Sequence, residues 1–131
     1  MTQLRISDAA ALLGVSDDTV RRMVDSGRLA AQRDTSGRLV VEGAELAAVA
    51  QEIATPAPVG SVADESARNR MRGIVTRVVK DRVMAQVELQ AGPFRIVSLM
   101  SAEAVDELGL EVGKVAVASI KSTHVIVGVP A

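Results

Sequence analysis

Residues 6–29 read ISDAAALLGVSDDTVRRMVDSGRL, and this stretch decides the fold of the first part of the chain. Ser7 and Ser16 are of the residue type that caps helix N-termini, and each is followed by acidic residues and by apolar residues at helical spacing. Gly14 and Gly27 are placed where the two periodic stretches end. The sequence therefore predicts two short helices joined by a tight turn, which is a helix-turn-helix.

A hairpin and a third helix are expected after this motif. Short extended runs at 29–32 and 38–41 flank the turn residues Asp34-Thr-Ser-Gly37, a pattern typical of a β-hairpin. Residues 44–53 have the composition of a helix. The expected order is helix, turn, helix, wing, helix.

This order resembles the MerR/excisionase type of winged helix-turn-helix domain over residues 3–53. The resemblance is carried by Ile6-Ser-Asp-Ala-Ala10, Leu13-Gly-Val-Ser16, Thr19-Val-Arg-Arg22, Ser26-Gly-Arg-Leu29 and Gly37-Arg-Leu-Val40. It implies that the second helix enters the major groove of double-stranded DNA and that the wing touches the backbone. The residues it implies at the DNA are Ser16, Thr19, Arg21 and Arg22 from the helix and Arg33 and Arg38 from the wing.

The distribution of charge limits how such a domain could bind DNA. Residues 1–55 carry six Arg against eight acidic residues, a net charge of −2, and residues 61–131 carry a net charge of +1. Binding must therefore depend on a few placed arginines rather than on a general positive field. Arg21 and Arg22 are adjacent and cannot both point into a groove. One of them is expected to pair with Asp17, Asp18 or Asp25.

A second domain with a different pattern follows a short linker. Thr55 to Ala63 holds two Pro and one Gly without periodicity, so we divide the chain into a domain at 1–54, a linker at 55–64 and a domain at 65–131. From residue 70 the apolar pattern has period two. It predicts strands at 70–79, 83–89, 94–99, 115–120 and 125–129, with a short helix from Ser101 to Gly109. The fold class is therefore α+β, with a winged helix-turn-helix followed by a five-stranded OB-like β-barrel that carries one short helix.

The second domain resembles the molbindin (Mop or TOBE) domain over residues 65–128. The matching stretches are Ser66-Ala-Arg-Asn-Arg70, Met71-Arg-Gly73, Val105-Asp-Glu-Leu-Gly-Leu110 with Gly113, and Ser119-Ile-Lys-Ser-Thr123. The resemblance implies a molybdate or tungstate ligand held between subunits of a dimer or of a trimer of dimers. Hydroxyl and cationic groups suit a tetrahedral dianion. The residues implied as ligands are Ser66, Arg68, Ser101, Lys121 and Ser122.

Composition excludes several other kinds of site. The chain has no Cys, one His, no Trp, no Tyr and one Phe, which excludes disulfides, thiolate metal sites and an aromatic platform for single strands. We expect no bare metal cation as ligand and no enzymatic activity, because His124 has no nucleophile–base arrangement to join. No apolar run approaches the length of a membrane span. A soluble cytoplasmic protein without a membrane partner is expected.

Three functions are compatible with these patterns. The leading hypothesis is a molybdate- or tungstate-responsive transcriptional regulator, a homo-oligomer that binds DNA through the helix-turn-helix. The first alternative is an intracellular molybdate storage protein whose helix-turn-helix is an interaction module. The second alternative is an excisionase-like DNA-bending protein whose barrel binds no ligand.

Overall fold

The computed structural model describes residues 2–60 and 65–131, so the part of the expected linker at 61–64 lies outside the described residues. The chain divides into two compact units, Met1–Thr55 and Pro56–Ala131, and each is described by itself. In the part of the chain that the structure covers, no helix is long and apolar enough to span a membrane.

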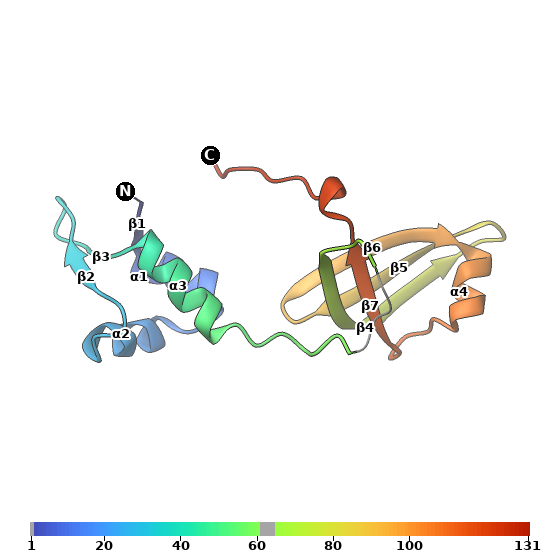
Figure 1. Cartoon of the computed structure of the whole chain (residues 1–131), viewed down its shortest axis with the longest axis horizontal. Coiled ribbons are helices and arrows are strands. Elements are labelled where there is room, and N and C mark those ends of the chain that lie inside the picture. The colour runs from blue at the N-terminus through green and yellow to red at the C-terminus, as the bar shows by residue number, and fades with distance from the viewer. Residues whose placement is uncertain (1, 61–64) are drawn as a thin grey trace. The chain divides into compact units, whose positions relative to one another are not determined.

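The first unit has the expected order of helices and wing, with one strand in addition. Its elements are β1 (Gln3–Arg5), α1 (Ile6–Leu13), α2 (Asp17–Asp25), β2 (Ala31–Arg33), β3 (Leu39–Glu42) and α3 (Gly43–Ile53). β2 and β3 form the wing around the turn at Asp34–Gly37, and β1 pairs with the other side of β3 to give the order β1-β3-β2 (Figure 1). The winged helix-turn-helix is therefore confirmed, and β1 is new.

The two helix caps predicted from serines have different outcomes. Ser16 does cap α2, because its hydroxyl accepts a hydrogen bond from the Thr19 backbone N–H at 3.2 Å. The prediction for Ser7 is wrong, because α1 begins at Ile6 and its N-cap is Arg5, without a capping side chain. Arg5 is the last residue of β1 and pairs with Val40, so the sheet, rather than a capping hydroxyl, fixes where the chain enters α1.

An apolar core joins the helices of this unit to its sheet. Leu29 and Val20 are completely buried, and they pack with residues of α1, β3 and α3. The buried members of this core are Ile6, Ala9, Ala10, Val20, Leu29, Val41, Leu46 and Val49. The helix-turn-helix is thus held by side chains that come from every part of the unit.

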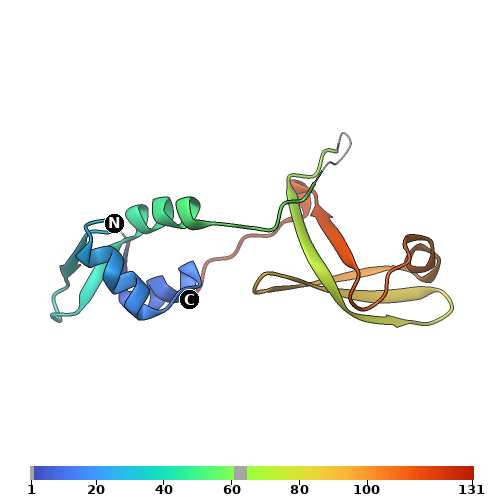
Figure 2. The same ribbon diagram turned by 90° about the horizontal axis from the view of Figure 1, so that it is seen from below.

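The second unit is a curled antiparallel sheet with one helix. Its elements are β4 (Asn69–Lys80), β5 (Met84–Ala91), β6 (Phe94–Ser101), α4 (Ala102–Leu108), β7 (Val115–Ile120) and the short 3₁₀ helix η1 (Ser122–His124). The strand order is β6-β5-β4-β7, and Figure 2 shows how strongly the strands bend. This arrangement confirms the α+β class and the OB-like character of the second unit.

The long strand β4 makes the sheet curl because its two halves have different partners. Its first half pairs with β7 from Asn69 to Ile74, and its second half pairs with β5 from Ile74 to Lys80. A register shift between Val75 and Arg77 marks a β-bulge, which bends a strand and increases its twist. The bend turns the inner faces of β5 and β7 toward a common core.

That core contains Val75, Ala85, Val87 and Leu89 from the sheet and Val105 from α4. The alternation along β5 is therefore confirmed on its apolar side. Val83, expected on the same side, lies in the turn before β5 and is 69% exposed.

Glu88 is buried on the polar side of β5, which the sequence did not indicate. Its carboxylate forms an ion pair with Arg95 of β6 and accepts a hydrogen bond from Gln86 at 3.3 Å. Arg95 lowers the pKa of Glu88 by hydrogen bonding to the charged form, as expected for a carboxylate beside a guanidinium.

The expected fifth strand at 125–129 is wrong. Residues 125–131 have no regular structure and follow η1 as an extended tail (Figure 1). Within the tail Ile126 is 94% exposed and Val129 is 91% exposed. The β-branched residues of the tail favour a strand locally, but the chain leaves the sheet through η1 after β7, and residues 125–131 pair with neither of its two edges. The sheet is consequently four-stranded and stays open between β6 and β7.

Candidate functional sites

Four of the five predicted oxyanion ligands lie at one end of the β4–β7 pair. Asn69 begins β4 opposite Ile120, the last residue of β7, and its side-chain amide donates to the Ile120 carbonyl oxygen at 3.2 Å. This register brings the segment before β4, with Ser66 and Arg68, alongside the segment after β7, with Lys121 and Ser122. All four of these side chains belong to exposed residues.

The segment before β4 is anchored on both sides of its candidate ligands. Ala67 is buried, whereas the flanking Ser66 and Arg68 are exposed. Glu65 accepts a hydrogen bond from Arg70 at its backbone oxygen, and the Arg70 Nε lies 3.2 Å from the Glu65 carboxylate. These contacts tie Glu65, which precedes the candidate ligands, to Arg70 of β4.

The fifth candidate, Ser101, is not brought to this place within one chain. It ends β6 opposite Met84, beside the turn that follows the other end of β4. Its hydroxyl accepts from the Ala104 backbone N–H at 3.1 Å and caps α4.

The open side of the curled sheet is an apolar groove of about 290 Å³. Its walls come from β5 and β6 on one side and from the end of α4 and β7 on the other. The lining residues include Leu89, Ile96, Met100, Leu108, Leu110 and Ala118. The groove is therefore lined by apolar side chains, as a protein core is, but it is open on one side.

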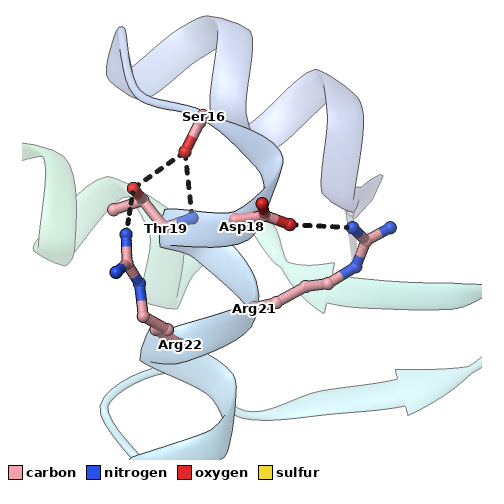
Figure 3. A network of polar contacts seen from close by, with 5 residues as sticks. All are labelled: Ser16, Asp18, Thr19, Arg21 and Arg22. Carbon is pink, nitrogen blue, oxygen red and sulfur yellow. Dashed lines mark hydrogen bonds and ion pairs between the residues drawn. The ribbon is translucent and has the colours of Figure 1, made fainter.

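The polar surface of α2 holds four of the predicted DNA contacts in two separate networks (Figure 3). In one, the Arg22 guanidinium donates to the Thr19 hydroxyl at 3.1 Å, and that hydroxyl lies 2.9 Å from the Ser16 hydroxyl. In the other, Arg21 forms an ion pair with Asp18 at 3.5 Å. The two adjacent arginines therefore point in different directions, as their adjacency requires.

The two wing arginines are both exposed. Arg33 donates to the Gly37 carbonyl oxygen at 2.8 Å, and the Asp34 carboxylate accepts from the backbone N–H groups of Ser36 and Arg38, each at 2.9 Å. The tip of the wing is thus closed by its own side chains, and its two arginines remain at the surface.

Arg28, whose function the sequence did not indicate, fixes the end of the helix-turn-helix. Its guanidinium lies 3.3 Å from the Glu52 carboxylate of α3, so it ties the turn after α2 to the third helix. No local pattern signals a pair separated by 24 residues. Among residues 2–60 and 65–131, no group of three or more His, Asp or Glu is placed to hold a metal ion.

The fold and sites define a helix-turn-helix protein with a TOBE domain. The helix-turn-helix domain family matches residues 4–53, and the TOBE domain family matches residues 65–127. The chain belongs, through its second domain, to the family of the molybdenum-pterin-binding (Mop) proteins.

Three known proteins illustrate this relationship. The probable molybdenum-pterin-binding protein of Haemophilus influenzae is 46% identical over 65 residues, which are 49% of this chain and 94% of that protein. The solved structure of MopII from Clostridium pasteurianum is 37% identical, with a TM-score of 0.48 over 50% of this chain and 100% of MopII. The structure of the cytoplasmic molybdate-binding protein ModG with molybdate bound is 43% identical, with a TM-score of 0.49 over 51% of this chain and 48% of ModG.

Proposed function

We propose that the protein is a molybdate-responsive transcriptional regulator that acts as a cytoplasmic homo-oligomer. The observation that carries this proposal is the presence, in one chain, of a winged helix-turn-helix with exposed arginines and of an oxyanion-type donor set in a Mop-family domain. Neither the storage function nor the DNA-bending function alone accounts for both parts.

The donor set suits a tetrahedral dianion. Lys121 and Arg68 supply positive charge, and Ser66 and Ser122 supply hydroxyl donors at the same strand end. Tungstate has the same shape and charge and is expected to bind as molybdate does. Hydrogen bonds to a charged ligand become strong when water is excluded, yet these four residues are exposed in the single chain. We therefore propose that a second chain covers the site and contributes its Ser101.

The apolar groove and the apolar tail support this assembly. The tail at 125–129 exposes Ile126, Val127 and Val129, and the groove between β6 and β7 lacks one wall. A tail from a second copy would pair with a free strand edge and bury both surfaces, a process favoured by about 25 cal/mol for each Å² of apolar surface removed from water. The assembly is a dimer, or a hexamer built as a trimer of dimers.

Titration calorimetry with sodium molybdate, and with sulfate as control, tests the ligand. We expect heat from molybdate alone, at or below one equivalent per chain. Lys121→Ala should abolish the heat, whereas Arg38→Ala, which removes one exposed positive charge from the wing of the first unit, should leave it unchanged. No molybdate heat from the native protein contradicts the ligand, and equal loss in both variants contradicts the site.

Selection of duplexes from a random-sequence DNA pool, with and without molybdate, tests regulation. A regulator should enrich a two-fold symmetric sequence and bind it with an affinity that depends on molybdate. Molybdate binding without any enriched duplex contradicts the regulator and favours storage. Light scattering of the protein truncated after His124 tests the assembly, because loss of the tail should give monomers.

A further inference from the structure

The helix α2 carries two neighbouring arginines, Arg21 and Arg22, whose surroundings differ; their different roles rest on the proposed DNA binding. Residues at the N-terminal part of the second helix of such a motif contact base edges. Both arginines of α2 reach back one turn toward that end, Arg21 to the Asp18 carboxylate and Arg22 to the Thr19 hydroxyl (Figure 3). They differ in their partners, because the neutral Thr19 leaves the charge of Arg22 uncancelled.

Thr19 connects Arg22 to the helix cap. Its hydroxyl accepts from Arg22 and lies 2.9 Å from the Ser16 hydroxyl, which also accepts from the Thr19 backbone N–H. An Arg side chain has many rotamers, and holding it in one of them before binding reduces the entropy that binding must remove. A guanidinium has five N–H donors, so the bond to Thr19 leaves donors free for a ligand.

Arg21, unlike Arg22, has a negatively charged partner, because its guanidinium forms an ion pair with Asp18. The ion pair measures 3.5 Å, and its side chains are 58% and 87% exposed. A pair this exposed is weak, but it cancels the charge of Arg21 where a phosphate would approach. Across α2 as a whole, Asp17, Asp18 and Asp25 outnumber the two arginines.

We propose that Arg22 donates hydrogen bonds to the edge of a guanine in the major groove and that Thr19 is its positioning residue. Asp18, by pairing with Arg21, keeps Arg21 from binding the DNA phosphates. Bidentate donation from Arg to guanine O6 and N7 is the commonest specific contact in the major groove. Contacts to phosphate add affinity without sequence information. The Asp18–Arg21 pair therefore lowers the attraction to all DNA and leaves the sequence-dependent contribution of Arg22 dominant.

Binding of the full-length protein to the selected duplex, and to a series with each guanine replaced in turn, tests the assignment to Arg22. Arg22→Ala should remove the preference for one guanine, a loss of roughly 5- to 150-fold in discrimination. Arg21→Ala is the matched control, since it removes the same charge from the next position, and it should keep every base preference. The inference is overturned if Arg21→Ala removes the preference and Arg22→Ala does not.

The roles of Thr19 and Asp18 have separate readouts. Thr19→Val should weaken discrimination at the same guanine, and Thr19→Ser, which keeps the hydroxyl, should restore it. Asp18→Asn should tighten binding to all duplexes and steepen the slope of log K against log[salt] by about 0.9 per protomer, the value for one added phosphate contact. Adding Arg21→Ala to Asp18→Asn should return the slope to its native value. An Asp18→Asn slope equal to the native one overturns this part.

Failure of this inference can be told from failure of the proposed function. If the native protein enriches no duplex, DNA binding itself is contradicted. If it enriches a site that Arg22→Ala binds with unchanged preference, only the inference is overturned. Circular dichroism melts of each variant identify any change that comes from unfolding of α2.

Discussion

Replacement of Gly73 by alanine is expected to destabilise the second unit, because the backbone of a neighbouring strand leaves no room for a side chain. Gly73 lies in β4, opposite Ala116 of β7, just where β4 changes partners. A Cβ atom at this position would lie 2.6 Å from the Gln90 carbonyl oxygen, 3.0 Å from the Gln90 carbonyl carbon and 3.3 Å from the Ala91 Cα. All three atoms belong to the backbone of β5, so Gly73→Ala forces β4 and β5 apart at the point where the sheet curls.

The expected cost follows from two opposing effects. Overpacking a well-packed region costs about 1–3 kcal/mol, and occasionally more, and the obstructing backbone places Gly73→Ala at the upper end of this range. Ala in place of Gly in a strand otherwise gains about 0.5–1 kcal/mol from conformational entropy. We therefore expect a net loss of about 2 kcal/mol in the unfolding free energy of the second unit. For a unit of this size the loss lowers its melting temperature by roughly 8–16 °C.

Differential scanning calorimetry of the full-length protein is the suitable assay, because the chain has neither Trp nor Tyr for fluorescence. Protein concentration must be constant, since in the proposed assembly the melting temperature depends on concentration. Glu111→Ala is the control, because Glu111 is exposed in the turn between α4 and β7, and its melting temperature should be native. A Gly73→Ala protein that melts with the native one would refute the close approach of β4 to β5.

Three further predictions concern single side chains. Leu29→Ala should lower the unfolding free energy of the first unit by about 2–5 kcal/mol, because Leu29 is completely buried and its truncation leaves a cavity. In calorimetry the loss should appear in the melting transition of the first unit, which Gly73→Ala leaves unchanged. Ser101→Ala should cost the second unit about 0.5–2 kcal/mol through loss of the α4 cap, with Ser101→Thr largely retaining stability. Arg95 lowers the pKa of Glu88, so the stability that Glu88 contributes is full above its ordinary pKa, about 4.3, and is lost as pH falls through the lower folded value. Urea unfolding between pH 3 and 7 should show that the unfolding free energy falls less on acidification for Glu88→Gln than for the native protein. An equal fall in the two proteins would contradict the role of Glu88.

Local patterns were sufficient to predict most of the elements. The cap at Ser16 and the alternation along β5 are signals that depend on neighbouring residues only, and both are confirmed. Ser7 failed as a cap because β1 pairs with β3 and sets the start of α1. The strand at 125–129 failed because its residues have strand propensity, but the chain turns away through η1 and pairs with neither edge of its own sheet. In both cases a contact distant in sequence, which periodicity does not record, decided the outcome.

The candidate sites were less predictable than the elements. The two family resemblances implied an oxyanion site and a DNA surface, and the register of Asn69 with Ile120 explains how the segments before β4 and after β7 come to lie at one end of this strand pair. The alternation of β5 could not predict that Glu88 is buried, since Arg95 covers it from a neighbouring strand. The adjacency of Arg21 and Arg22 predicted that their directions differ, but not which of them pairs with Asp18.

The uncovered edges of the second unit have a consequence for how the protein must be handled. Edge strands usually carry charges, prolines or bulges that prevent pairing with unrelated chains. β7 reads VAVASI, without a charged residue, and β6 has Arg95 alone. A chain whose edges are not yet occupied is therefore a template for irregular aggregation. In the proposed assembly the same two edges would pair with a second copy, so the yield of the protein should fall when chains are synthesised faster than they pair, for example in strong overexpression at high temperature.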